Sequence, residues 1–302
     1  MTDLSKFLTK NNHLYQKPVS FEKNIDNNAY AVSLIKKKIK VLNEIHNVDY
    51  SEKFWQILLL PFTQQLFEIL EDRYNLLDSI SSKHKFKFEY NKKYVSSYLI
   101  KNRNIFSDLR NFADDDKINF FLCSFIVSET SLKKSFFIKD DNKISKFDSE
   151  HIKVEKPISL AIFILTKIKS LFTFLAKKFN RKLLFFDFSV PAKSLIKISL
   201  KLGQFPSFAS HKVPHKKPHS KFRENHEEHL LDLNKSEIFN FFNKNYIKFL
   251  PVEFLENFSE NDKEFKSVHK IKYICCSRPT SANYAVRFAL AHLLDNGGKL
   301  LT

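Results

Sequence analysis

Glycine is scarce in this sequence: only three of its 302 residues are glycine. The sequence therefore has too few glycines for architectures that depend on many tight glycine turns. No G-x-G-x-x-G or Walker A pattern occurs, which excludes the dinucleotide fingerprint and the P-loop as motifs. At this length, with 43% apolar residues, the chain is nevertheless large enough to bury a core in one or two domains.

Cysteines and long apolar runs are also scarce. The three cysteines form no C-x-x-C pair and have no metal-ligand spacing, so we predict reduced thiols in a cytoplasmic protein. The most apolar stretch, residues 157–176, is interrupted by Lys167 and Lys169 and falls short of the roughly 18–20 residues that span a bilayer. The N-terminus has no apolar core of the signal-peptide kind, so no secretion is predicted.

Positive charge is concentrated in one segment. The net charge is +17, and residues 151–221 hold fifteen Lys and Arg against two acidic residues. This bias favours a phosphate-rich partner or an anionic membrane surface, which leaves attachment to the inner face of the membrane open. The lysines expected to make such contacts are Lys156, Lys167, Lys178, Lys212, Lys216 and Lys217. The first three are eleven residues apart, which places them along one side of a helix.

Two helices are predicted in the first third of the chain. Apolar residues recur at helical spacing over about 33–46 and again over about 52–78. Ser51 is a good N-cap for the second helix, and Pro61 predicts a kink within it. Three acidic residues, 114–116, precede an apolar stretch. We interpret them as helix-start residues rather than ligands, because neighbouring side chains point in different directions, and we predict no metal.

The last third of the chain has the order of an α/β fold. Strands are predicted over 182–188 and 271–276, with helices from about Pro191 to Gly203 and over 282–294, and a last strand begins near Leu300. We therefore predict an α/β protein. A weakly structured segment, 1–30, precedes a helical region, 31–180, and a partial Rossmann-like parallel sheet occupies 181–302.

Two polar stretches of this α/β region suggest anion binding. Ser277, Arg278, Thr280 and Ser281 lie between a predicted strand and helix, where loop groups and helix amides bind phosphate. An ordinary capped loop is the alternative. The stretch 209–230 is basic and rich in histidine. Because prolines interrupt its helical histidine spacing, we expect a mobile basic loop there rather than a zinc site.

The sequence LNEIHNVDYSEKFWQILLLPF, followed by Asp72, Arg73 and Tyr74, resembles a motif of sugar transferases from bacterial surface polysaccharide loci, a family first labelled from a leptospiral lipopolysaccharide locus. The match is close at Leu42, Asn43, Glu44, Ile45, His46, Val48, Ser51, Trp55, Ile57, Leu58 and Pro61. It departs at two positions. The family usually has Gly where this sequence has Leu60, and more often Trp where it has Phe62. A second match covers Pro251, Phe254, Leu255, Glu256 and Phe258.

The resemblance implies a two-domain glycosyltransferase of the GT-B type. Its donor would be a nucleotide-activated sugar, which is a co-substrate rather than a cofactor, and its acceptor a lipid-linked molecule or a glycan. His46 and Glu44 fall in the motif and are candidates for the catalytic base; core or capping roles are the alternative. Because the family continues into a second α/β half, we expect an N-terminal fragment that is inactive without its missing C-terminal half.

A competing hypothesis is a basic protein without enzymatic activity. Residues 151–221 would then bind a membrane or another polyanion, with an affinity that falls steeply as salt rises. No motif indicates recognition of a specific nucleic acid.

Overall fold

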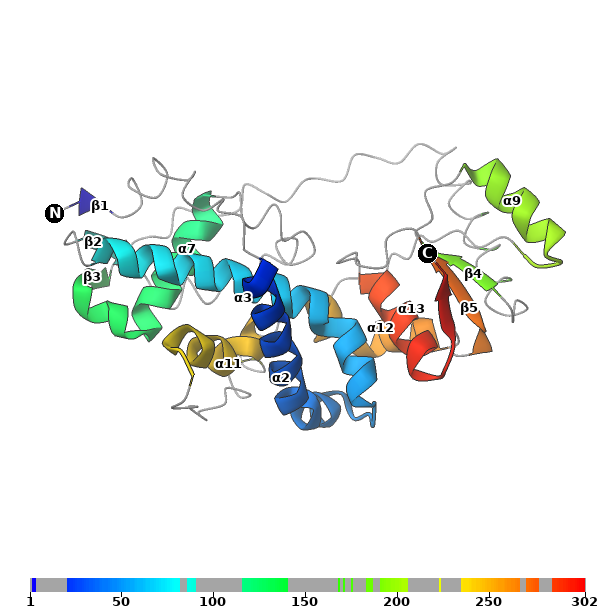
Figure 1. The fold of residues 1–302 in the computed structure, drawn as a ribbon, viewed down its shortest axis with the longest axis horizontal. Coiled ribbons are helices and arrows are strands. Elements are labelled where there is room, and N and C mark those ends of the chain that lie inside the picture. Colours follow the sequence, from blue (N-terminus) through cyan, green and yellow to red (C-terminus); the bar gives the residue numbers. More distant parts are fainter. Residues whose placement is uncertain are drawn as a thin grey trace. The chain divides into compact units, whose positions relative to one another are not determined.

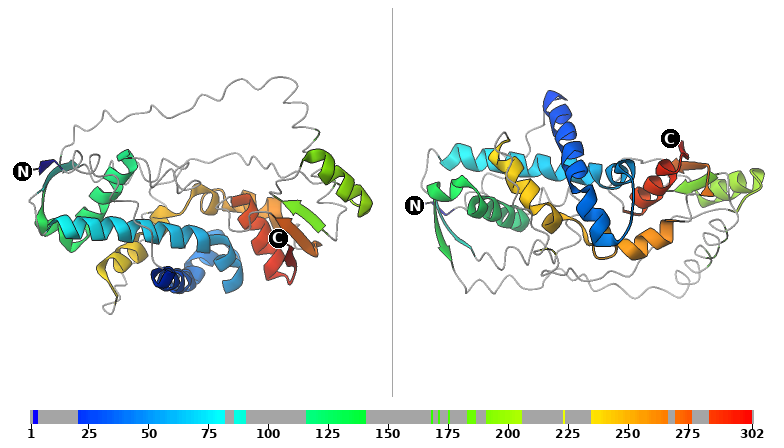
Figure 2. Two further views of the ribbon diagram at one scale, coloured as in Figure 1. Left: turned by 45° about the horizontal axis from the view of Figure 1, so that its top comes forward. Right: turned by 90° about the horizontal axis from the view of Figure 1, so that it is seen from below.

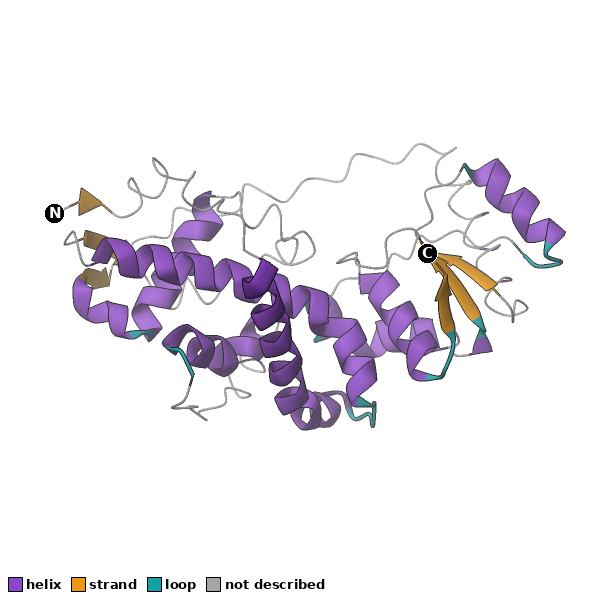
Figure 3. Ribbon diagram, in the orientation of Figure 1, coloured by secondary structure: helices purple, strands orange, loops and turns teal. Residues whose placement is uncertain are grey.

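The computed structural model describes most of the predicted helices and strands. The described residues are 2–3, 21–81, 86–90, 116–140, 183–186, 191–205, 235–266, 270–276 and 284–301, together with Ile168, Leu171, Leu175 and Arg223. These parts are rich in helix and contain two small parallel sheets, as the colouring of Figure 3 shows. The α/β class predicted from the sequence is confirmed.

The chain forms two compact units, and each is assembled from segments that are distant in the sequence. Unit 1 comprises residues 1–37, 62–148 and 216–256. Unit 2 comprises residues 38–61, 149–215 and 257–302. The sequence motif around His46 therefore belongs to unit 2, and the Asp72–Tyr74 part of the same motif belongs to unit 1.

Two long helices contribute to both units (Figure 1). Helix α2 spans Phe21–His46, so it extends into the segment expected to be weakly structured. Helix α3 spans Glu52–Ser81 and runs through Pro61. Ser51 caps α3 as predicted, because its Oγ accepts a hydrogen bond from the Phe54 N–H at 3.1 Å. The predicted pair of helices is confirmed.

Within the described residues, the rest of unit 1 comprises two further helices, two short 3-10 helices and a sheet. Their bounds are α7 (Asp116–Glu129), η2 (Ser131–Ser135), α11 (Glu237–Phe249) and η3 (Val252–Phe254). Strands β1 (Thr2–Asp3), β2 (Phe86–Tyr90) and β3 (Phe136–Asp140) form a parallel sheet in that order. The sequence analysis did not predict this sheet.

Aromatic side chains fill much of the unit 1 core. Phe242 and Tyr246 of α11 are fully buried, and the Tyr246 hydroxyl lies 2.7 Å from the Thr63 Oγ1 of α3. Burying a large apolar side chain stabilises a fold by about 1.5–3 kcal/mol. The apolar positions of α3 and α11 therefore hold these helices together, and the tyrosine hydroxyl keeps a polar partner.

Unit 2 contains the predicted βαβ arrangement. Strands β4 (Leu183–Phe186), β5 (Tyr273–Cys276) and β6 (Lys299–Leu301) are parallel and lie side by side in that order (Figures 1 and 2). The described part of the unit also contains helices α9 (Ala192–Lys201), α12 (Phe258–Phe265) and α13 (Tyr284–Asp295). Helix α13 connects β5 to β6, which confirms the strand, helix and strand predicted at the end of the sequence.

Glycines follow α9 and α13, and Gly203 lies at the predicted end of the first of these helices. Gly203 has a φ of +65° and Gly297 a φ of +78°, a backbone region that L-residues with side chains rarely adopt. Each glycine lets the chain turn sharply after its helix. None of the helices within the described residues has the length and apolar character needed to cross a membrane. The stretch 157–176, considered for a membrane role, lies outside them apart from three single positions.

Candidate functional site

The carboxyl ends of β4 and β5 lie next to each other at one edge of the unit 2 sheet. Phe186, the last residue of β4, pairs with Cys276, the last residue of β5. Because the strands are parallel, the chain leaves both at the same edge, which is where open α/β sheets bind their ligands. The predicted anion-binding residues follow β5 directly in the sequence. Ser277, Arg278, Thr280 and Ser281 all lie outside the described residues.

A buried cation lies close to this edge. Arg287, in the first turn of α13, is 6% exposed. Burial lowers the pKa of its guanidinium to about 10, and electrostatic interaction with Cys276 acts in the opposite direction. The group remains positively charged at neutral pH. A buried charge has to be compensated by its surroundings, so Arg287 is a fixed positive group in the first turn of the helix that follows β5.

The sequence analysis selected Arg278 and missed Arg287. A signal was present, because Arg287 and His292 are the two residues of the helix YAVRFALAHLLD with strongly polar side chains inside an apolar stretch. Both prove to be buried, at 6% and 2% exposure. Basic side chains in a mostly apolar helix are usually retained because they have a partner or a function.

The two residues predicted to act as a base point in different directions. Glu44 is exposed, and its Oε1 lies 4.0 Å from the Lys40 Nζ one turn earlier in α2. His46 stacks its ring on Phe258, with 3.9 Å between ring centroids, and lies 5.8 Å from the Trp55 ring. Residues two apart in a helix lie on nearly opposite faces. The structure therefore does not bring Glu44 and His46 together.

Near His46, a carboxylate is shared by a tyrosine and a second histidine. The Tyr50 hydroxyl donates to Asp262 Oδ1 at 2.7 Å, and His292 Nε2 lies 3.0 Å from the same oxygen without hydrogen-bond alignment. Burial is the largest cause that raises the pKa of Tyr50, followed by its bond to Asp262. The tyrosine therefore stays protonated at neutral pH and acts as a donor.

A carboxylate beside an imidazole can orient a general base. In this protein, His292 and Asp262 are only 2% and 9% exposed, and a tyrosine already donates to the carboxylate. The three groups come from the α2–α3 turn, α12 and α13. The geometry therefore supports a role in holding these three elements together.

Asn43 holds the same turn from the other side. Its Oδ1 accepts hydrogen bonds from the Trp55 Nε1 at 2.8 Å and from the Tyr50 N–H at 3.3 Å. Its Nδ2 donates to the Tyr50 carbonyl at 3.1 Å. The hydroxyl of Ser51 donates to Asp295, and the Lys53 ammonium donates to the Leu294 carbonyl at the end of α13. The polar residues of this motif thus build the turn and attach it to α13.

The unit 1 part of the motif is also built into the fold. Arg73 is 1% exposed, pairs with Asp72 and donates from Nε to Asn119 Oδ1 of α7 at 2.8 Å. The Tyr74 hydroxyl donates to Glu237 Oε2 of α11 at 2.9 Å. These contacts connect α3 to α7 and to α11 within unit 1.

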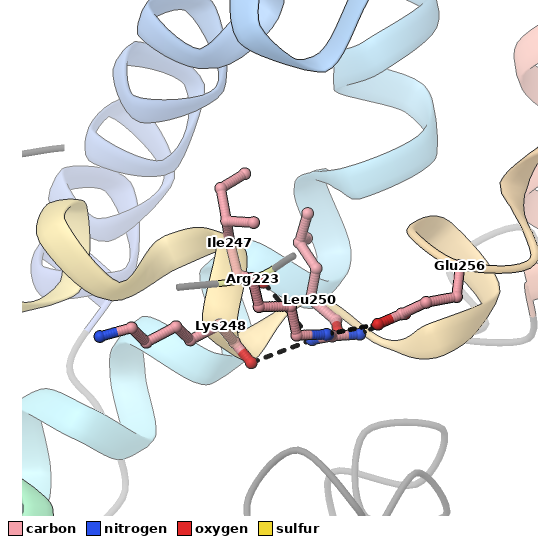
Figure 4. Close-up of polar contacts among 5 residues, drawn as sticks. All are labelled: Arg223, Ile247, Lys248, Leu250 and Glu256. Carbon is pink, nitrogen blue, oxygen red and sulfur yellow. Dashed lines mark hydrogen bonds and ion pairs between the residues drawn. The ribbon is translucent and has the colours of Figure 1, made fainter. Parts of the chain in front are cut away.

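A buried arginine from the histidine-rich stretch has a similar function. Arg223 donates to the carbonyls of Lys248 at 3.0 Å and Leu250 at 2.6 Å, and its guanidinium pairs with Glu256 (Figure 4). Glu256 belongs to the second match to the family motif. Its carboxylate therefore has a structural partner that the sequence did not reveal.

The candidate lysines at 156, 167, 178, 212, 216 and 217 lie outside the described residues. Within the described ranges, no three His, Cys, Asp or Glu side chains are grouped so that they could hold a metal ion.

The comparison with protein families agrees with the motifs. A model of the LIC12162 family of transferases matches residues 5–302, so the chain belongs to this transferase family. No curated protein and no solved structure matches the chain.

Proposed function

We propose that this transferase is a glycosyltransferase of the GT-B type. It moves a sugar from a nucleotide-activated donor to a cell-surface polysaccharide or to a lipid-linked acceptor. Two kinds of observation support the proposal. The chain belongs to a transferase family, and its unit 2 has a parallel sheet with a buried arginine near the carboxyl edge. The buried Arg287, in the first turn of the helix that follows β5, is the observation that carries the proposal.

The reaction explains why a cation is needed at this edge. When the acceptor oxygen attacks the anomeric carbon, the nucleoside diphosphate leaves with the bonding electrons and gains negative charge. Fixed positive groups and N–H donors stabilise that charge in the transition state. Arg287 would supply the charge and the first amides of α13 the N–H donors. Ser277, Arg278, Thr280 and Ser281 would complete the phosphate site.

The acceptor hydroxyl also needs a base. Glu44 is solvent-exposed, so an acceptor can reach its carboxylate, whereas the His46 ring is packed on Phe258. We therefore assign the base to Glu44 in this proposal and the positioning of the turn to His46.

The experiment is a thermal-unfolding screen with uridine, guanosine and thymidine diphosphates, their glucose or mannose derivatives, polyphosphate and heparin. Selective stabilisation by one nucleotide class, retained at high salt, is the expected result. Stabilisation by polyphosphate and heparin alone, lost at high salt, would contradict the proposal and favour a basic protein without enzymatic activity.

Helix α9 favours a second property, attachment to an anionic membrane surface. Lys193, Lys197 and Lys201 are exposed and four residues apart, so they line one face of the helix. Ile196 and Leu200 beside them are 39% and 66% exposed. Lysines next to exposed aliphatic side chains are typical of helices that lie on anionic bilayers.

Vesicle sedimentation tests this second property. The protein should sediment with vesicles that contain phosphatidylglycerol, and less with vesicles of phosphatidylcholine alone. Replacing the three α9 lysines by glutamate should release it, whereas Lys263→Glu, at an exposed position of α12 in the same unit, should not. Equal binding by both variants would rule out α9 as the contact.

A further inference from the structure

Unit 1 contains a pocket that is separate from the residues discussed so far. It has a volume of about 410 Å³ and is lined by α2, by Phe67 of α3 and by the start of α11. In Figure 2 (right), the dark blue part of α2 crosses α3, and α11 lies next to the crossing. Pockets that bind small molecules have volumes of roughly 300–1,000 Å³, so this one can hold a small ligand.

One polar group in the pocket wall has an unused donor. Asn27 is 4% exposed, and its side-chain Nδ2 has no hydrogen-bond partner within the described part of the protein. Leaving a buried amide donor without a partner costs about 1–3 kcal/mol. Native proteins rarely accept that cost unless a water or a ligand takes up the bond. The Asn27 amide is therefore available to donate to an acceptor oxygen of a water or of a ligand in the pocket.

Further polar groups surround Asn27 in the pocket wall. Asp26 and Ser33 lie on the same side of α2, and Lys235 faces them from the residues before α11. All three are exposed, so their carboxylate, hydroxyl and ammonium groups are accessible to a ligand. The two charges are opposite in sign. The pocket thus offers both donors and acceptors but no excess charge for a phosphate or another ion.

The apolar part of the wall is aromatic. Tyr30 packs against Phe67 and Phe239 with ring centroids 4.1 and 3.9 Å apart, and the ring planes are tilted by 47° and 55°. The Lys235 Nζ lies 5.6 Å from the centre of the Phe239 ring. Phe67 and Phe239 are each only 5% exposed, so little of their ring faces is open for a nucleobase to stack on. They can still contact the C–H groups of a ligand.

We infer that this pocket binds a neutral saccharide unit. A sugar ring has apolar C–H groups for the aromatic wall. Its hydroxyls can accept from Asn27 and Lys235 and donate to Asp26. All residues that line the pocket belong to unit 1, so the sugar-binding inference does not depend on the proposed function. The use of the pocket as the acceptor site of the transferase rests on the proposed function.

Ligand-observed NMR tests the inference on the full chain. The probes are the methyl glycosides of glucose, galactose, mannose, rhamnose and N-acetylglucosamine. At least one should receive saturation from the protein. Asn27→Leu should weaken its binding about tenfold and leave the melting temperature unchanged or higher, since the substitution removes a buried donor that lacks a partner. Asn28→Leu is the matched control, because Asn28 is exposed and does not line the pocket.

A second pocket variant keeps the inference testable if Asn27→Leu does not fold. Asp26→Ala changes an exposed residue of the wall and should also weaken the binding. Absence of binding by every glycoside, or equal binding by the wild type and both pocket variants, would overturn the inference. The response to nucleoside diphosphates is measured on the same samples. If it persists while no glycoside binds, the pocket inference fails and the transferase proposal stands.

Discussion

Arg223 and Glu256 form a doubly hydrogen-bonded ion pair inside unit 1. The Arg223 Nε lies 2.7 Å from Glu256 Oε1, and the Nη2 lies 2.6 Å from Oε2. Their side chains are only 2% and 7% exposed. The Nη1 of the same guanidinium donates to the carbonyl of Lys248, in the last turn of α11, and to that of Leu250, which follows the helix (Figure 4). One arginine therefore satisfies both a carboxylate and a helix end.

Removing either partner of this pair should strongly destabilise the protein. Glu256→Gln leaves a buried guanidinium without its counter-charge, and breaking a buried pair in this way costs about 3–5 kcal/mol. Arg223→Lys should cost a similar amount, because an ammonium cannot bind both carboxylate oxygens and the carbonyls together. Thermal unfolding measures both effects. Glu44→Gln, at an exposed position, is the control. Midpoints equal to that of the control would contradict the structural role.

Asn43 makes a second testable contribution, to the α2–α3 turn. Asn43→Ala removes three hydrogen bonds and leaves the Trp55 indole N–H without its acceptor. We expect a loss of about 2–4 kcal/mol, because a buried orphan donor alone costs about 1–3 kcal/mol. Asn43→Asp keeps the acceptor oxygen and should cost less. Urea unfolding monitored by tryptophan fluorescence measures this order, and equal losses for both variants would refute it.

High pH should destabilise the protein through its buried tyrosines. Burial raises the pKa of Tyr30 and Tyr246 well above the ordinary value of 10.0. The folded state therefore holds these protons more tightly than the unfolded state. The stability they contribute is complete below pH 10 and is lost as the pH rises above it.

A pH series of unfolding midpoints, together with tyrosinate absorbance, checks this prediction. Above pH 10 the folded protein should show less tyrosinate than the protein in denaturant. Tyr246→Phe should reduce the pH dependence at a cost in stability, since it also removes the bond to Thr63. Identical tyrosinate titrations of the folded and unfolded protein would show that these rings are accessible to hydroxide.

Elements set by local chemistry could be predicted from the sequence. Ser51 precedes a stretch with helical spacing, and its hydroxyl caps α3. Gly203 and Gly297 follow the helices that they end, because only the backbone turn matters there. The order of β5, α13 and β6 was also predicted, because each of these elements has its own local pattern in the sequence. Each of these signals lies within a few residues of the structure that it determines.

Contacts between distant segments could not be predicted. Strand β2, FKFEY, alternates apolar and polar residues, but it is only five residues long and its partners are distant in the sequence. It pairs with β1 and with β3, both about fifty or more residues away. Arg223 lies in a stretch expected to be a mobile basic loop, yet its side chain is buried by partners in α11 and beyond. Charged residues are usually exposed, so only the fold reveals such exceptions.

The same limit applies to the candidate site. The motif residues predicted for catalysis include His46, whose ring packs on Phe258, more than two hundred residues further along the chain. Arg287 lies inside an apolar helix, where periodicity alone favours a core residue. Its electrostatic interaction with Cys276, the last residue of β5, depends on how β5 and α13 fold and could not be predicted from the sequence.

Calorimetric titration with a nucleoside diphosphate tests the central claim most directly. The wild type, Arg287→Met and Lys263→Met are compared, with Lys263 as an exposed cation of the same unit. Arg287→Met should weaken binding about 10- to 100-fold, since a hydrogen bond to a charged group is worth about 1.5–3 kcal/mol. Lys263→Met should bind as the wild type does. Equal affinity in all three proteins would contradict a donor site at the carboxyl edge of this sheet.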